Sequence, residues 1–303
     1  MTTSAQQRQP APPPPRTFPS PATLDHPYRA ARIAVGTAHG KHRQLAGAFA
    51  DTFGATLVVP TGLDTDQFGT FSGEVTRHLT AQDAAVAKAQ LAMTITGIPL
   101  AIASEATYGN LYGFIPVHEE ILVFCDHTRG IQLTETTRTT LTPGPPRPIT
   151  QPDDALPAAA TFGFPQQGAV VFSRPPQPPR IFGKGITDPA TLHATATDAL
   201  TLAHATPLYI GPDLRAHHNP TRQVTLTEVA HTLATRLATL CPRCRCPGYG
   251  TIATQLGLPC RECNTPTDQP HADIHGCPRC SHRHTVPRSP HRADPGACPT
   301  CNP

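Results

Sequence analysis

Cysteine is the residue type whose spacing most clearly predicts chemistry in this sequence. Four Cys-x-x-Cys pairs lie near the C-terminal end, and 15, 13 and 17 residues separate one pair from the next. Two intervening residues let both thiolates of a pair reach one ion, and two pairs complete a tetrahedral set of four sulfurs. We therefore predict two zinc ions per chain. The eight predicted ligands are Cys241, Cys244, Cys260, Cys263, Cys277, Cys280, Cys298 and Cys301.

The spacing leaves the partnering of these cysteine pairs open. Consecutive pairs would give two successive zinc ribbons, whereas the first pair with the third and the second with the fourth would satisfy the same spacing. Consecutive partnering closes the shorter loops, so we expect it. Cys246 then remains a spare thiol. A site of four thiolates has no open coordination position, and the segment has few large apolar side chains, so its predicted role is structural.

The distribution of cysteine also bears on the cellular compartment. Nine of the ten cysteines follow residue 240, which argues against a disulfide framework spread through the chain. The N-terminal residues lack the apolar stretch of a secretory signal, and no run of 18 apolar residues could span a membrane. We expect a cytoplasmic protein with reduced thiols and no membrane partner.

The formal charge divides at the same boundary. Residues 1–240 carry 17 basic and 17 acidic side chains, while the last 63 residues carry seven arginines and four acids. The whole excess of +3 therefore belongs to the cysteine-rich segment. An excess of this size leaves two partners open for the ribbons: a nucleic acid, contacted through Arg243, Arg245, Arg279 and Arg283, or another protein.

The elements that would position these residues follow from local patterns. Residues 1–27 are rich in proline and predict a disordered leader. Leu45, Phe49 and Phe53 share one helical face. The predicted strands are 32–36, 56–59, 100–103, 120–125, 130–135 and 169–172, and the predicted helices are 41–53, 81–96, 189–204 and 220–240. This alternation indicates an α/β domain over 28–240, with Pro-rich loops at 141–180, followed by a double zinc ribbon over 241–303.

Glu105 is the residue of this domain that local pattern alone singles out. It follows the apolar run Leu-Ala-Ile-Ala, and the carboxyl ends of buried strands are where α/β sheets bind ligands. Asp64 and Asp66 lie in a polar loop, where they can equally serve turns around Gly62 and Gly69.

Three stretches carry a resemblance to a known superfamily. Residues 35–49 run from a strand into Thr-x-x-x-Lys and a helix. Residues 80–109 carry Ala-x-x-Lys-Ala and then Thr-Gly-x-Pro before a strand, and residues 213–222 precede the last helix. Together these resemble the inosine-triphosphate-pyrophosphatase-like superfamily. The resemblance implies a mixed-sheet pyrophosphatase-like domain that binds a nucleotide.

The same resemblance implies roles for particular residues. Lys41 and Lys88 would meet phosphates in a cleft, and Glu74 and Glu105, with Asp64 and Asp66 nearby, would hold Mg²⁺. Three further side chains would face the base or the phosphates of the nucleotide: Arg215, His217 and Arg222.

Over its full length the chain resembles an uncharacterised bacterial family, the domain of unknown function numbered 6671. The carriers of this resemblance are TDQFGTFSGE, DLRAHHNPTR and the cysteine pairs. It implies no activity. Two hypotheses therefore stay open: a zinc-binding protein that binds or hydrolyses a nucleotide or a nucleic-acid phosphate with Mg²⁺, and a non-catalytic module that binds nucleic acid or protein through its ribbons.

Overall fold

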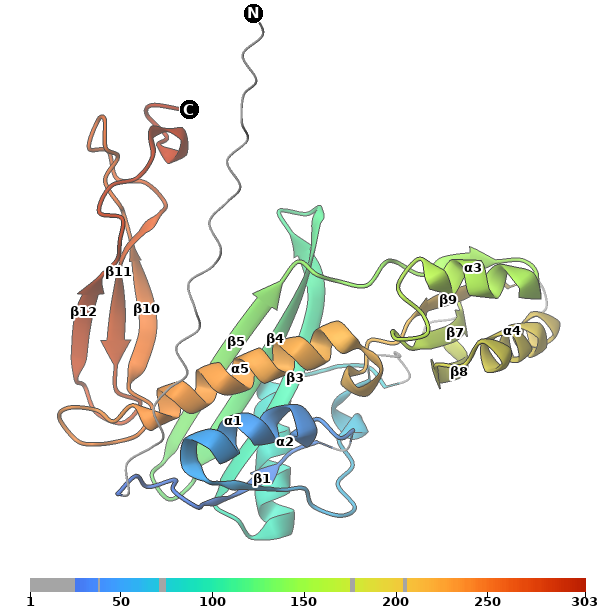
Figure 1. Cartoon of the computed structure of the whole chain (residues 1–303), viewed down its shortest axis with the longest axis horizontal. Coiled ribbons are helices and arrows are strands. Elements are labelled where there is room, and N and C mark those ends of the chain that lie inside the picture. The colour runs from blue at the N-terminus through green and yellow to red at the C-terminus, as the bar shows by residue number, and fades with distance from the viewer. Residues whose placement is uncertain (1–24, 38, 71–74, 175–177, 204–205) are drawn as a thin grey trace, which may run out of the picture.

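The computed structural model describes residues 25–303 with the exception of 38, 71–74, 175–177 and 204–205. Within these residues the strands form sheets of five, four and three strands. Figure 1 shows the five-stranded sheet and its helices in the middle of the molecule, with the four-stranded sheet near one end of helix α5 and the three-stranded sheet near the other.

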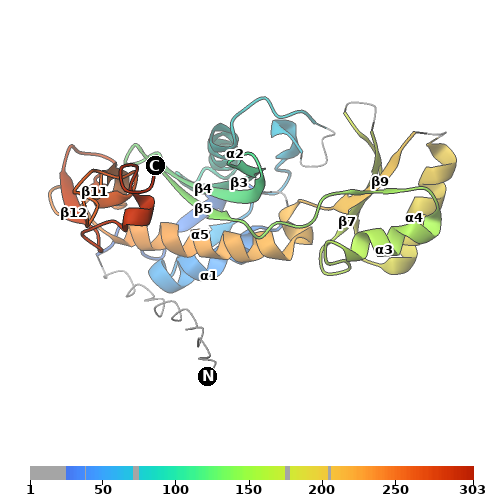
Figure 2. The same cartoon turned by 90° about the horizontal axis from the view of Figure 1, so that it is seen from above.

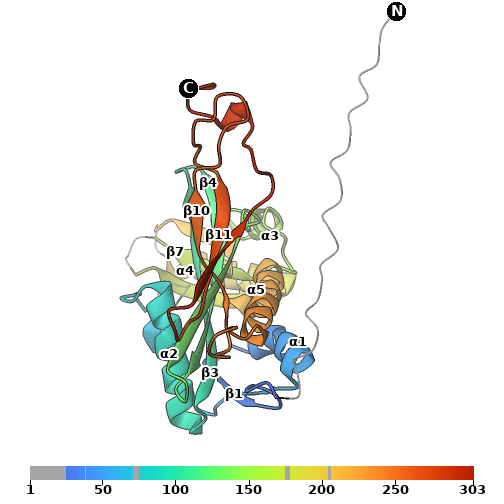
Figure 3. The same ribbon diagram turned by 90° about the vertical axis from the view of Figure 1, so that its left-hand side faces the viewer.

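The central sheet has the strand order β2-β1-β3-β4-β5. Its strands are β1 (Arg32–Val35), β2 (Thr56–Val58), β3 (Leu100–Leu111), β4 (Ile115–Asp126) and β5 (Ile131–Thr139). Strand β1 is parallel to both β2 and β3, while β3, β4 and β5 form an antiparallel meander. Helices α1 (His42–Phe53) and α5 (Pro220–Ala238) cover one face and α2 (Ala81–Thr96) covers the other (Figure 3). The predicted mixed-sheet α/β class is confirmed.

Local sequence signals account for these three helices. Leu45, Phe49 and Phe53 are buried along α1, as their spacing predicts. The side chains of Thr80 and Asn219 each accept a hydrogen bond from a backbone N–H three residues on, which caps α2 and α5. The apolar core of the domain is therefore built from helix faces that the sequence periodicity identifies.

Strands β3 and β4 are longer than their apolar segments predict. The prediction covered residues 100–103 and 120–125, but the two strands pair without interruption from Leu100–Asp126 to Leu111–Ile115. The added residues include the buried polar side chains of Ser104, Glu105 and His118, and only those near the β3–β4 turn are part-exposed or exposed. Cross-strand pairing, which the sequence of one strand does not reveal, specifies their conformation.

Residues 141–214 contain a lobe with its own sheet. Its elements are β6 (Arg147–Ile149), α3 (Ala155–Ala160), β7 (Ala169–Ser173), β8 (Arg180–Ile186), α4 (Pro189–Leu202) and β9 (Leu208–Pro212), and its strand order is β6-β9-β7-β8. A separate apolar cluster includes Val171, Leu192 and Ile210. The expectation of loop and edge structure at 141–180 was incomplete, because short elements interrupted by Pro and Gly give weak periodic signals. Figure 2 shows this lobe beyond the end of the central domain.

The cysteine-rich segment folds around one antiparallel sheet of β10 (Gly250–Leu256), β11 (Pro270–Gly276) and β12 (Arg283–Pro287). Its buried apolar cluster is thin and joins Cys241 and Cys246 to Ile131 of the central domain. We call residues 241–303 the Cys module. Its burial alone is too small to hold a fold of this length, in agreement with the predicted need for metal.

The N-terminal leader predicted over 1–27 lies mostly outside the described residues, which begin at 25. His26 is buried, and its Nε2 lies 3.1 Å from the carbonyl oxygen of Leu237 at the end of α5. Order therefore begins slightly earlier than the composition predicts. Among the described helices, none is both long and apolar enough to cross a membrane.

Candidate functional site

A crevice opens where β1 ends between the helices of the two faces. The connection from β1 to β2 passes through α1, and the connection from β2 to β3 passes through α2 on the opposite face. Such a point, where neighbouring connections diverge, is where open α/β sheets bind ligands. Gly36 follows β1 there, and a Cβ atom at this position would lie 2.5 Å from the carbonyl oxygen of Lys88. The close approach of strand and helix thus requires glycine.

The crevice holds a small cavity of about 50 Å³ with a strongly cationic lining. We call it the switch-point pocket. Its cationic side chains are Lys41, Arg77, Lys88, Lys184, Arg215 and Arg222, and its anionic ones are Asp66 and Glu105. Two further carboxylates, Glu120 and Asp213, pair with lining arginines. Cations still exceed anions by two, so the pocket favours an anion.

Lys41 enters the pocket from the start of α1. Its Nζ donates hydrogen bonds of 3.0 Å to both the carbonyl oxygen and the Oγ of Ser104. Burial and the nearby positive charges of Arg222 and Lys88 lower the pKa of Lys41 to about 8, although Glu105 and Glu120 act in the opposite direction.

Glu105 lies on the α2 side of the sheet between two cations. One carboxylate oxygen accepts a hydrogen bond from Lys88, and the other accepts one of 3.1 Å from Arg77. Burial alone would raise the pKa of Glu105, but Lys41, Lys88 and Arg77 together hold it below its ordinary value. Glu105 is therefore an ionised counter-ion, with both of its oxygens occupied by protein donors.

A buried ion pair forms the floor of the pocket. Arg222 of α5 donates hydrogen bonds of 3.0 Å from Nε and Nη2 to the two carboxylate oxygens of Glu120 on β4. His118 lies 3.2 Å from the same carboxylate. Burial would raise the pKa of Glu120, but Arg222, His118 and Lys41 lower it to about 2. The bidentate contact holds the guanidinium rigidly against the sheet.

The wall toward the second lobe contains another arginine–carboxylate pair. Arg215 donates from Nη2 to the buried Asp213 at 2.6 Å and from Nε at 3.0 Å. At the mouth of the pocket, His39 Nε2 lies 3.0 Å from Asp66 Oδ1. The His39 ring stacks on His217, whose pKa is lowered to about 4 by burial and by neighbouring positive charges.

The structure brings most of the predicted residues of the α/β domain together. Lys41, Lys88, Glu105, Arg215 and Arg222 all line the switch-point pocket, and His217 contacts its rim through His39.

Of the two aspartates predicted near the Mg²⁺ site, only one lines the pocket. Asp66 lines the pocket, whereas Asp64 accepts a hydrogen bond from the backbone N–H of Asp66 and so serves a turn, as its loop position allowed. Glu74 lies outside the described residues.

Sequence reasoning missed several residues of the pocket. Arg77, Ser104 and Lys184 line it, and Glu120 and Asp213 orient its arginines. The sequence identifies Glu120 only as the first residue of a predicted strand and indicates no role for its side chain. Its position opposite Ala106 depends on the β3–β4 register, which a single sequence does not give.

The eight predicted metal ligands form two compact groups. Cys241, Cys244, Cys277 and Cys280 make one, and Cys260, Cys263, Cys298 and Cys301 make the other. The hydrogen-bonding distances between sulfurs of facing pairs run from 3.5 to 3.9 Å. A tetrahedral ion with Zn–S bonds of about 2.3 Å requires sulfurs about 3.8 Å apart. Both groups could therefore hold a metal ion, and the donor set fits zinc.

The expected partnering of consecutive cysteine pairs is wrong. The first pair joins the third and the second joins the fourth, because β10 and β11 are antiparallel. Gly250, just after the first pair, lies opposite Gly276, just before the third. The second pair lies at the far end of this hairpin, where the fourth pair returns after β12. One sheet thus carries a site at each end, in place of two successive ribbons.

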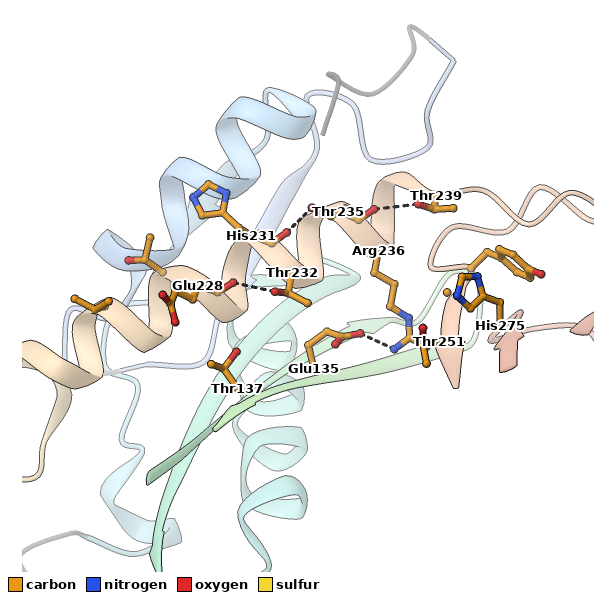
Figure 4. Close-up of a pocket in the computed structure, with 14 residues that line it drawn as sticks. Glu135, Thr137, Glu228, His231, Thr232, Thr235, Arg236, Thr239, Thr251 and His275 are labelled. Carbon is orange, nitrogen blue, oxygen red and sulfur yellow. Dashed lines mark hydrogen bonds and ion pairs between the residues drawn. The ribbon is translucent and has the colours of Figure 1, made fainter. Parts of the chain in front are cut away.

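A larger cavity of about 1180 Å³ lies elsewhere, between α5, β5 and the Cys module (Figure 4). Its threonine hydroxyls at 232, 235 and 239 donate to carbonyls of α5, and Arg236 donates to Glu135 at 2.6 Å. Arg236 also donates to the carbonyl oxygen of Gly248. We interpret this cavity as the seam that joins the Cys module to the central domain, because residues of both line it and Arg236 of α5 reaches the backbone of Gly248 in that module.

These features define a class: an α/β protein with a cationic pocket at the switch point of its sheet and a C-terminal module with two cysteine tetrads. The chain belongs to the family described as Domain of unknown function (DUF6671), whose sequence model matches residues 88–303. No curated protein matches the sequence. The resemblance to the inosine-triphosphate-pyrophosphatase-like superfamily stays a prediction, because the family match neither supports nor opposes it.

Proposed function

We propose that the switch-point pocket binds the phosphates of a nucleotide and that the protein hydrolyses a phosphoric anhydride bond there with Mg²⁺. The observation that carries this proposal is the convergence of six lysine and arginine side chains on one small cavity at the end of β1. Phosphoryl transfer depends mainly on positioning and on stabilisation of charge by such cations. A cavity of about 50 Å³ suits one phosphate group, with the rest of the ligand outside it.

Asp66 is the carboxylate that we assign to Mg²⁺. Both oxygens of Glu105 accept hydrogen bonds from Lys88 and Arg77, so Glu105 is better suited to hold those two cations in place. Mg²⁺ commonly binds through one or two carboxylates together with substrate phosphates. Asp66, at the mouth of the pocket, is positioned for that arrangement.

We further propose that both cysteine tetrads hold zinc in a structural role. Four thiolates fill the tetrahedral coordination of zinc, so neither site offers a position for substrate. The tetrad that contains Cys241 contacts the central domain near Ile131. The tetrad that contains Cys260 closes the far end of the module.

A turnover screen tests the proposed activity. The full-length protein is incubated with nucleoside triphosphates and Mg²⁺, and released phosphate and pyrophosphate are measured. We expect turnover that is lost in Glu105→Gln and Lys41→Ala and retained in the exposed-surface variant Arg138→Gln. Absence of turnover, with unchanged nucleotide binding in both pocket variants, would contradict the proposal. Salt-sensitive nucleic-acid binding that survives Glu105→Gln but fails in Cys277→Ser would support the ribbon-based alternative.

A further inference from the structure

The contact between Lys41 and Ser104 has the geometry of a base and a nucleophile. The Nζ of Lys41 lies 3.0 Å from the Oγ of Ser104, within reach for direct proton transfer. Both side chains line the switch-point pocket, and both are almost fully buried. Ser104 lies just past the end of β1, because Val35 is paired with Ile102 of β3. The hydroxyl therefore faces the crevice in which the proposed phosphate would bind.

The charges around Lys41 favour loss of its proton. Arg222 approaches from α5 and Lys88 from α2, and both disfavour a third positive charge. Glu105 on β3 and Glu120 on β4 oppose them, but each already pairs with other cations. With burial as the largest effect, the pKa of Lys41 falls from its ordinary value of 10.5 to about 8. A lysine must be neutral to accept a proton, and with this pKa about a tenth of Lys41 is neutral at pH 7 and about half at pH 8.

We propose that Ser104 is the nucleophile of the switch-point pocket and that Lys41 is the base that removes its proton. This inference rests on the proposed phosphohydrolase function and adds the identity of its attacking atom. Serine paired with lysine is a recurrent variant of the serine–base arrangement in hydrolases. It replaces direct attack by water with a covalent phosphoserine intermediate.

The reaction proceeds in two balanced steps. In the first, Ser104 Oγ forms a bond to phosphorus while the bond from phosphorus to the leaving phosphate oxygen breaks. The hydroxyl proton moves to neutral Lys41 and then to the leaving group. In the second, a water oxygen bonds to the same phosphorus, the Oγ–phosphorus bond breaks, and Lys41 carries one water proton back to Oγ. Arg222 and Lys88 stabilise the negative charge of the phosphoryl group.

A purely structural role for Lys41 predicts different behaviour. Its second hydrogen bond, to the carbonyl oxygen of Ser104, ties the start of α1 to β3 and would by itself stabilise the fold. A lysine with only that role would leave the serine hydroxyl as unreactive as any other. The buried Ser173 of β7, in the second lobe, is a suitable comparison because it is equally buried but lies outside the pocket.

Chemical labelling tests the proposal without knowledge of the natural substrate. The full-length protein is treated with diisopropyl fluorophosphate, which phosphorylates an activated serine with loss of fluoride, and the modified residue is located by peptide mass spectrometry. We expect labelling of Ser104 and none of Ser173. The rate should rise between pH 6 and pH 9 with a midpoint near the Lys41 pKa of about 8. Inorganic phosphate should slow the labelling.

Lys41→Arg is the decisive variant because arginine keeps the positive charge and a hydrogen bond to Ser104 but does not act as a base. We expect its labelling rate to fall by about 100-fold or more, the usual contribution of a general base. Calorimetry with inorganic phosphate checks the pocket itself. Phosphate binding without labelling of Ser104, or labelling that is equally fast in Lys41→Arg, would overturn the nucleophile assignment alone. Labelling of Ser104 without phosphate binding would instead refute the proposed function and retain the reactive pair.

Discussion

The alternating partnering of the cysteine pairs predicts how double substitutions affect metal content. Cys244 and Cys277 belong to the same tetrad, whereas Cys244 and Cys260 belong to different ones. Cys244→Ser with Cys277→Ser should therefore damage one site and leave one zinc per chain. Cys244→Ser with Cys260→Ser should damage both sites. Consecutive partnering would reverse these two results, so the pair of variants separates the arrangements.

The entropy cost of closing the longer loops is small compared with the free energy that zinc binding contributes. Alternating partnering encloses 32 and 34 residues between paired knuckles, against 15 and 17 for consecutive partnering. Each doubling of loop length costs only about 0.6 kcal/mol in closure entropy, or about 1.2 kcal/mol for two sites. A structural zinc contributes on the order of 10 kcal/mol. The hairpin that aligns the pairs offsets the difference, because β10 and β11 exchange backbone hydrogen bonds along six paired positions.

The assay is metal analysis of the purified variants by mass spectrometry, with wild type expected to hold two zinc ions. Serine at Cys246, which belongs to neither tetrad, is the matched control and should retain two. One zinc in the Cys244/Cys260 variant, together with none in the Cys244/Cys277 variant, would refute the alternating arrangement. Fewer than two ions in wild type would refute the presence of two zinc sites.

Two further predictions concern the central domain and the seam. Glu120→Gln leaves the buried Arg222 without its counter-ion, so we expect the free energy of unfolding, measured by urea titration, to fall by about 3–5 kcal/mol. The double variant Glu120→Leu with Arg222→Met should recover part of that loss. The pKa of Glu120 in the folded protein is depressed to about 2, so its contribution to the free energy of unfolding is complete above about pH 4.5 and is lost as the pH falls toward 2. The difference in the free energy of unfolding between pH 5 and pH 3 should therefore be smaller in Glu120→Gln than in wild type. Arg236→Ala removes the contacts to Glu135 and Gly248. Amide hydrogen exchange should therefore increase at the junction of α5 with the Cys module and stay unchanged in the second lobe. An exchange rate that changes equally in all parts of the protein would contradict the role of Arg236 at this junction.

Sequence periodicity predicted the parts of the fold that depend on local signals. The face of Leu45, Phe49 and Phe53 specified α1, and Thr80 and Asn219 specified the starts of α2 and α5, because helix faces and caps act within a few residues. In the second lobe the predicted strand at 169–172 and helix at 189–204 are confirmed as β7 and α4. Strands β6, β8 and β9 were missed, because they are short, contain Gly or Pro and are stabilised by partners distant in sequence.

The candidate site shows the same division. Glu105 could be named in advance because it follows a recognisable apolar strand, and Lys41 and Lys88 because their segments resemble those of a known superfamily. Glu120 and Ser104 could not, since their roles depend on which residue faces them across the sheet or crevice. The cysteine ligands followed from spacing, but their partnering followed from strand direction, which outweighs a loop-closure difference of about 0.6 kcal/mol per site.

Calorimetric titration of the full-length protein with inorganic pyrophosphate tests directly whether the switch-point pocket binds phosphate. We expect saturable binding of one pyrophosphate per chain, weakened by salt. Binding should be lost in Arg215→Ala, which removes the guanidinium that Asp213 holds at the wall of the switch-point pocket. No saturable binding, or equal binding by Arg215→Ala, would contradict a phosphate site at this pocket.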